Sequence, residues 1–271
     1  MRRMVIAVAA AAVVAASART LAQQDNATIV VQQDPTVAAP GKWKAGGSIE
    51  FWTVREEQPG PSGGTIERNL QQGGWSFFAG YGDLTAQVTH RSGAGDFSGS
   101  NTPQTFTGNA RRSEDELVLR WLISGLATRY FVPYVLGGYA WVDSKRSFNA
   151  TDGSTFACSG SGNQQARVKF DAPTLGLGAI FPFNERFGLR VDGRYKPYKV
   201  SAHADGCNDV SGNADGGDFT ATGYYNFGGG WNAQIGARRQ SLPGIPNAPG
   251  GASFGVRSTG LFGMLGYTYA F

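Results

Sequence analysis

The sequence predicts an all-β fold, an up-and-down antiparallel β-barrel that spans a membrane, with ten strands preferred and eight possible. Three observations support it: an export signal at the start, a rhythm of alternating segments, and a terminal strand that ends on an aromatic residue. Glycine is abundant, at 40 of 271 residues, and charged residues make up only 16%. This composition is typical of many strands joined by turns.

Residues 1–22 are expected to be a signal peptide. Arg2 and Arg3 precede about a dozen apolar residues, fewer than the roughly 20 that a membrane-spanning helix needs. Cleavage is expected after Ala18 or Ala22, and Ala22 is preferred because polar residues follow it. The signal holds three of the 24 basic residues and none of the 20 acidic ones, so the mature chain has a net charge of +1. This charge argues against a nucleic-acid partner.

Segments with strand character follow, separated by stretches rich in turn residues. Ten are predicted: 43–55, 73–81, 84–92, 114–124, 132–145, 167–181, 186–198, 218–227, 230–239 and 257–271. An eight-stranded alternative would place 218–239 in a long loop. Residues 23–42 are expected to be a flexible periplasmic segment, and 43–271 the barrel domain.

The gaps between these segments alternate between short and long. The long gaps are 56–72, 93–113, 146–166, 199–217 and 240–256. Short periplasmic turns and long external loops are the usual asymmetry of an outer-membrane barrel. The even strand count then predicts that both termini lie in the periplasm.

Within the segments, apolar residues alternate with polar or charged ones, which predicts one lipid-facing and one lumen-facing side. A soluble barrel with apolar residues inside is the alternative. The charged residues expected to line the lumen are Glu50, Arg120, Arg190, Asp192, Arg194, Lys196 and Arg238. These side chains either fill the interior or line a narrow pore. A filled interior is preferred.

The last strand carries a specific pattern. Gly266, Tyr269 and Phe271 resemble the terminal insertion signal of bacterial outer-membrane proteins, although Met264 stands where that pattern prefers a polar residue. The resemblance implies a Gram-negative outer-membrane location and recognition by the barrel-assembly machinery. Outer-membrane lipids and lipopolysaccharide would surround such a barrel.

Two further stretches, within 73–81 and 133–141, resemble the small outer-membrane barrels grouped with the opacity proteins and the OmpA-type membrane domain. These families commonly have eight strands. The long, exposed loops and the lack of a catalytic set favour a structural or surface-interaction role, with loops that could bind an external ligand. A narrow porin-like channel for small solutes is the alternative.

His90 and Ser92 form a weak catalytic candidate. Residues i and i+2 share one face of a strand, so the pair could act as base and nucleophile. It faintly resembles the His-x-Ser of lipid A deacylases, a less favoured enzymatic alternative, but the sequence identifies no acidic third member. The protein is expected not to be an enzyme.

The predicted loop 199–217 holds His203 and several acidic residues. Omptin proteases are ten-stranded barrels with acids and a histidine at the outer rim, but no matching pair of Asp residues is found on an opposing strand. Oxygen ligands for Ca²⁺ are a second alternative. Neither a metal nor a cofactor is predicted. Cys158 and Cys207, in two predicted external loops, are expected to form a disulfide.

Overall fold

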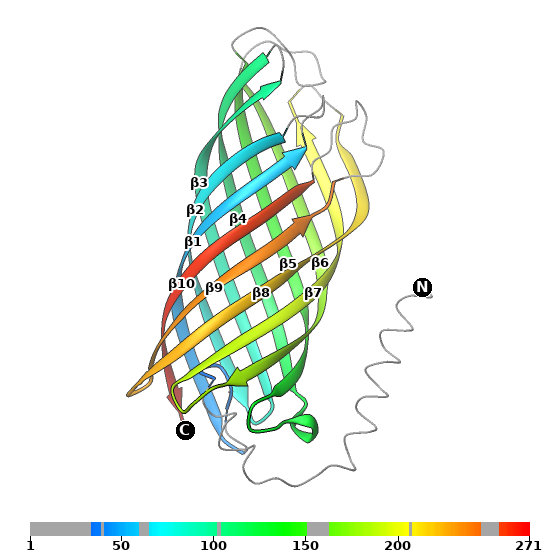
Figure 1. The fold of residues 1–271 in the computed structure, drawn as a ribbon. Helices are drawn as coiled ribbons and strands as arrows, with labels where there is room; N and C mark the ends of the chain where they lie inside the picture. Colours follow the sequence, from blue (N-terminus) through cyan, green and yellow to red (C-terminus); the bar gives the residue numbers. More distant parts are fainter. Residues whose placement is uncertain are drawn as a thin grey trace.

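The computed structural model describes residues 34–38, 41–59, 65–101, 104–150, 163–205, 208–244 and 255–271. Ten antiparallel strands form a closed barrel (Figure 1), which confirms the preferred strand count. The strands are β1 (Trp43–Pro59), β2 (Thr65–Tyr81), β3 (Leu84–Asn101), β4 (Gln104–Leu122), β5 (Val132–Ala150), β6 (Asn163–Pro182), β7 (Phe187–Ala204), β8 (Val210–Gly228), β9 (Trp231–Leu242) and β10 (Val256–Ala270). The expected signal peptide and both cysteines lie outside the described residues.

The two ends of the barrel differ. The short connections 82–83, 123–131, 183–186 and 229–230 all lie at one end, here called the short-turn end. The chain termini of the barrel meet at the same end, where the amide and carbonyl of Trp43 exchange hydrogen bonds of 3.0 Å with those of Phe271. The opposite end is here called the long-loop end.

The strand register sets the tilt of the barrel. Following directly opposite residues once around the barrel from Tyr225 on β8 leads back to β8 at Asn213, twelve residues away. A shear of this size for ten strands corresponds to strands tilted by roughly 35–45°. Figure 1 shows the inclined strands.

Side chains alternate between the outer wall and the interior. Large apolar residues such as Ile49, Phe77, Leu177 and Ile235 are exposed on the outer wall, whereas charged residues are buried inside. A soluble barrel has the reverse arrangement, so this pattern fits a lipid exterior. The described residues include no helix long and apolar enough to span a membrane.

The strands continue well beyond their predicted ends at the long-loop end. The predicted loop 93–113 is almost entirely strand, because β3 and β4 pair as far as Asn101 and Gln104. The predicted loops 56–72, 146–166 and 199–217 are shortened in the same way. In these extensions the described outward residues include no large apolar side chain, so the apolar alternation used to find strands is absent although the ladder continues.

Residues Asp34–Ala38 differ from the expectation of a flexible segment over 23–42. All five are buried inside the barrel at the short-turn end. The segment forms a turn in which the Val37 amide donates to the Asp34 carbonyl at 3.0 Å. It therefore fills part of the lumen.

Candidate functional site

All seven charged residues expected in the lumen have side chains inside the barrel. Six are buried and Arg194 is half-buried. The interior holds further charges, which brings the described total to seven acidic and ten basic side chains, the tenth being Lys44, which donates to the Asp34 carbonyl at 2.9 Å. The acidic residues are Asp34, Glu50, Glu56, Glu114, Glu116, Asp192 and Asp218, and the basic residues are Lys44, Arg68, Arg91, Arg112, Arg120, Arg146, Arg190, Arg194, Lys196 and Arg238.

A cluster of ion pairs, here called the central cluster, crosses the middle of the lumen. The Lys196 ammonium donates to Glu116 at 2.7 Å and lies 2.9 Å from the Asp218 carboxylate. Arg238 bridges Asp218 at 2.5 Å and Glu114 at 2.7 Å. Because these residues come from β4, β7, β8 and β9, the cluster ties opposite walls of the barrel together.

A second cluster lies around Glu56, toward the long-loop end. Arg112 lies 2.8 Å and Arg68 3.3 Å from the two carboxylate oxygens of Glu56. Arg146 donates to the Gln58 side-chain oxygen at 2.6 Å. Three guanidinium groups therefore gather near one carboxylate, and Arg112 also contacts Glu114, which joins this group to the central cluster.

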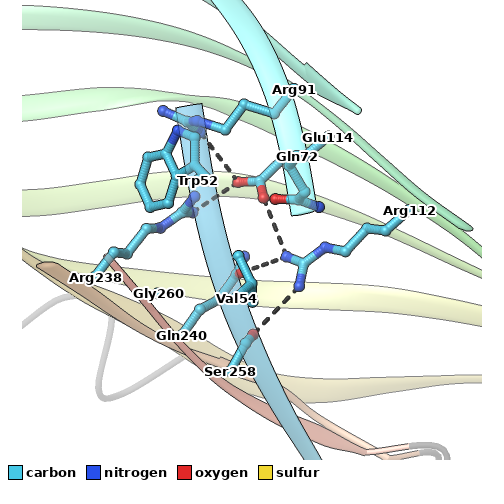
Figure 2. A pocket seen from close by; sticks show the side chains of 10 residues that line it. All are labelled: Trp52, Val54, Gln72, Arg91, Arg112, Glu114, Arg238, Gln240, Ser258 and Gly260. Carbon is cyan, nitrogen blue, oxygen red and sulfur yellow. Dashed lines mark hydrogen bonds and ion pairs between the residues drawn. The ribbon is translucent and has the colours of Figure 1, made fainter. Parts of the chain in front are cut away.

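Little empty space remains between these groups. A cavity of about 20 Å³ lies beside Trp52, Arg91, Arg112, Glu114 and Arg238 (Figure 2). This volume is enough for about one water molecule. Apolar side chains fill the lumen elsewhere. Near the long-loop end they are Val142, Val168, Phe170, Ala172, Tyr198, Val200, Ala202, Leu242 and Val256.

The buried segment Asp34–Ala38 is held by side chains from several strands. Arg190 on β7 lies 3.1 Å from the Asp34 carboxylate, and Arg120 on β4 donates to Thr36 Oγ1 at 2.7 Å. Thr85 on β3 donates to the Thr36 carbonyl at 3.0 Å. A cavity of about 380 Å³ beside this segment, lined in part by Trp231 and Tyr267, opens at the short-turn end.

His90 and Ser92 lie on the outer wall, on the same face of β3 as Leu84 and Val88. The structure adds an acidic residue that the sequence did not identify. His90 Nδ1 lies 2.7 Å from the Asp115 carboxylate, and these two residues are directly opposite each other on β3 and β4. The Trp75 ring packs on the other side of His90, with centroids 5.6 Å apart.

His203 lies on β7 near its end at the long-loop side, not in a loop as the sequence predicted. Its Nδ1 forms a 2.5 Å contact with Asp209. This hydrogen bond and the negative charge of Asp209 raise the pKa of His203 above its usual value. Within the described part of the chain, no group of three or more His, Cys, Asp or Glu residues is placed to hold a metal ion.

The terminal strand closes the barrel by pairing with β1. Tyr269 and Phe271 are exposed on the outer wall, and their rings lie 5.7 Å apart. Gly266 lies opposite Ser48, and a Cβ atom at Gly266 would come within 2.9 Å of the Asn232 side chain. Glycine therefore fits the close packing at this position.

Several interior residues were missed by the sequence analysis. Glu114 and Glu116 are separated from Arg120 by even numbers of positions, so they lie on the same inward face of β4. This spacing was the signal that could have identified them. Glu56, Arg68, Arg112 and Arg146 belong to predicted loops, where no lumen face was assigned.

Comparison with known proteins gives a match in structure only. No family model and no curated protein matches the sequence. The fold resembles that of the outer membrane protease OmpT from Escherichia coli, with a TM-score of 0.54 and 11% identity, covering 86% of this chain and 97% of that chain. It also matches the translocator domain of the autotransporter NalP from Neisseria meningitidis, with a TM-score of 0.48 and 14% identity, covering 83% and 88% of the two chains.

The fold is thus that of the outer-membrane β-barrels, as the sequence predicted. At 11% identity, the likeness to OmpT shows a common architecture alone. The activity of this chain must be argued from its own residues.

Proposed function

We propose that this protein is an outer-membrane barrel with a closed lumen and a structural or surface-interaction role. The main support for this proposal is that the described lumen is filled. Crossing ion pairs, apolar clusters and the segment Asp34–Ala38 occupy it, and the cavity beside the central cluster has a volume of only about 20 Å³. If the lumen is closed, the function of the protein must reside on its outer wall and at the long-loop end.

The narrow-channel alternative makes the opposite prediction about conductance. Purified protein inserted into planar bilayers should give no steady conductance if the lumen is closed. Insertion should be checked on the same sample by the different gel migration of folded and boiled barrels. Reproducible single-channel steps from folded protein would overturn the proposal and favour a channel.

The orientation forms part of the proposal. The short-turn end would face the periplasm, after removal of residues 1–22 and insertion through the terminal signal of Gly266, Tyr269 and Phe271. The long-loop end would then face outside. The length of the strands supports this assignment, because eight strands have 17–20 residues, whereas about 9–11 span a bilayer.

The surplus strand length would form a rigid sheet above the membrane, with charged outward residues such as Lys145 and Arg167 available to an external ligand. Labelling of intact cells with a membrane-impermeant maleimide tests the orientation. Lys145→Cys should be labelled and Glu185→Cys, at the short-turn end, should not. The unsubstituted protein measures the background from Cys158 and Cys207. Labelling of Glu185→Cys and not of Lys145→Cys would show that the short-turn end faces outside, opposite to the proposed orientation.

A further inference from the structure

A row of basic side chains crosses the outer wall toward the long-loop end. Arg111 on β4 lies directly opposite Lys145 on β5, and Lys145 lies opposite Arg167 on β6. His203 on β7 lies opposite Arg167 and ends the row, where it contacts Asp209. All four basic side chains are exposed on the outer wall. These four residues are here called the basic row.

The basic row is an unfavourable arrangement for the fold alone. Like charges directly opposite each other on neighbouring strands repel and destabilise a sheet. Asp143 relieves Arg167 in part, because the Nε of Arg167 donates to it at 3.0 Å. Arg111 and Lys145 have no ion-pair or hydrogen-bond partner among the described residues. We propose that the basic row binds a linear acidic polysaccharide that carries one carboxylate on each sugar.

The spacing of the basic row fits a polymer of this kind. Neighbouring strands lie about 4.8 Å apart, and the row presents one basic side chain on each of β4, β5, β6 and β7. A 1,4-linked chain of uronic acids advances by a similar distance with each sugar, and each sugar carries one carboxylate. A chain that lies across the strands can therefore place one carboxylate near each basic side chain. Arginine and lysine bind carboxylates through charge-assisted hydrogen bonds, and their length lets them reach either edge of the chain.

The residues next to the basic row suit sugar hydroxyl groups. On the side away from the membrane, Asn109, Ser147 and Gln165 form a second row of outward residues in directly opposite positions. Their amide and hydroxyl groups donate and accept hydrogen bonds, as sugar hydroxyls require. A single-stranded nucleic acid would instead call for aromatic side chains on which its bases stack. The described outward residues immediately beside the row include no Phe, Tyr or Trp, so a saccharide is favoured.

The height of the basic row favours a partner that approaches from outside over the lipids of the same membrane. On β4 the large apolar outward residues end at Leu117, and Arg111 lies further along the strand. With a rise of about 3.3 Å per residue and a tilt of roughly 40°, Arg111 lies about 15 Å beyond Leu117. On β4, β5 and β6 the first charged outward residue beyond the apolar band is acidic, namely Asp115, Asp143 and Asp171. These carboxylates separate the row from the lipid headgroups and repel their phosphates.

The inference rests on the proposed orientation, which places the basic row outside the cell. Binding is therefore measured on the purified full chain in detergent micelles, where orientation plays no part, and the gel shift on boiling confirms folding. The probes are galacturonate oligomers of defined length, followed by isothermal titration at low salt, with neutral dextran oligomers of the same lengths as the control. Absence of binding by the folded protein refutes the site. Reversed maleimide labelling of intact cells refutes only its placement outside.

Galacturonate oligomers should bind and dextran should not. The double variant Arg111→Gln/Lys145→Gln should weaken binding at least about 10-fold, because two charged hydrogen-bond donors are lost. It should remain folded, since the substitutions relieve repulsion between the two strands. The matched control is Arg239→Gln/Arg257→Gln, which removes two exposed outward cations from β9 and β10, separated from the row by β8 on one side and by β1–β3 on the other. This control should keep the unsubstituted affinity, and an equal loss in both double variants would overturn the proposal, because binding would then depend on net charge alone.

The length of the polymer tests the spacing. A tetramer reaches all four side chains of the basic row and a dimer reaches only two, so affinity should rise from dimer to tetramer and much less beyond it. No gain between dimer and tetramer would contradict the proposed alignment across the strands. The same titration with purified lipopolysaccharide tests the other anionic partner. If lipopolysaccharide binds through Arg111 and Lys145 and the galacturonate tetramer does not bind, the occupant is a membrane lipid and the proposal is wrong.

Discussion

Neutralising Glu114 should destabilise the barrel strongly. Glu114 is buried, and its two oxygens face Arg238 at 2.7 Å and Arg112 at 3.1 Å. At these distances each attraction amounts to roughly 5 to 6 kcal/mol at an effective dielectric constant of about 20, before the cost of desolvation is counted. Breaking a buried ion pair from one side typically costs about 3–5 kcal/mol, because the partner charge stays buried. Glu114→Gln should therefore lower the free energy of unfolding by about 3–5 kcal/mol.

The measurement is denaturant unfolding from lipid vesicles, followed by tryptophan fluorescence, with the midpoint and slope both fitted. Glu67→Gln is the matched control, because Glu67 forms a 2.7 Å ion pair with Arg55 on the exposed outer wall. That substitution should cost less than about 1 kcal/mol. Equal small losses for the two variants would refute the reasoning, since they would mean that water screens the lumen as it screens the surface.

The sign of the interior charge provides a second check on the same reasoning. The described lumen holds ten basic and seven acidic side chains, so removing an acid widens the imbalance and removing a base narrows it. Among the described residues, two nitrogen atoms of Arg146 are buried without a hydrogen-bond partner. Arg146→Gln should therefore change stability by less than about 1 kcal/mol in either direction, far less than Glu114→Gln.

Two other predictions concern the outer wall and the long-loop end. Ile235→Arg, on the lipid-facing side of β9, should cost about 2–4 kcal/mol of unfolding free energy, whereas Ser241→Arg nearer the long-loop end should cost about 0–1; equal costs would contradict the proposed membrane band. His203 should titrate by NMR with a pKa above the ordinary histidine value, and Asp209→Asn should lower its midpoint. Because folding raises this pKa, the contact contributes stability at low pH and loses it as pH rises through the folded value. A midpoint that Asp209→Asn leaves unchanged would contradict the contact.

The sequence was sufficient to predict the barrel, because a lipid exterior imposes a period of two wherever a strand crosses the membrane. In β9, Ile235 alternates with Gln234 and Gly236, and the strand was found there. In the outer half of β3 both faces are polar or glycine-rich, and that half was predicted as a loop. The extension was missed because the alternation of apolar and polar residues marks only the part of a strand that faces lipid, whereas the hydrogen-bonded ladder continues beyond it.

Contacts between distant residues could not be predicted in the same way. Asp34 meets Arg190 across 156 positions, and no periodicity marks a five-residue turn that enters a lumen. Asp115 lies opposite His90 only because the register of β3 and β4 brings them together. Register depends on turn length and on the polar extensions, which the sequence analysis had placed in a loop.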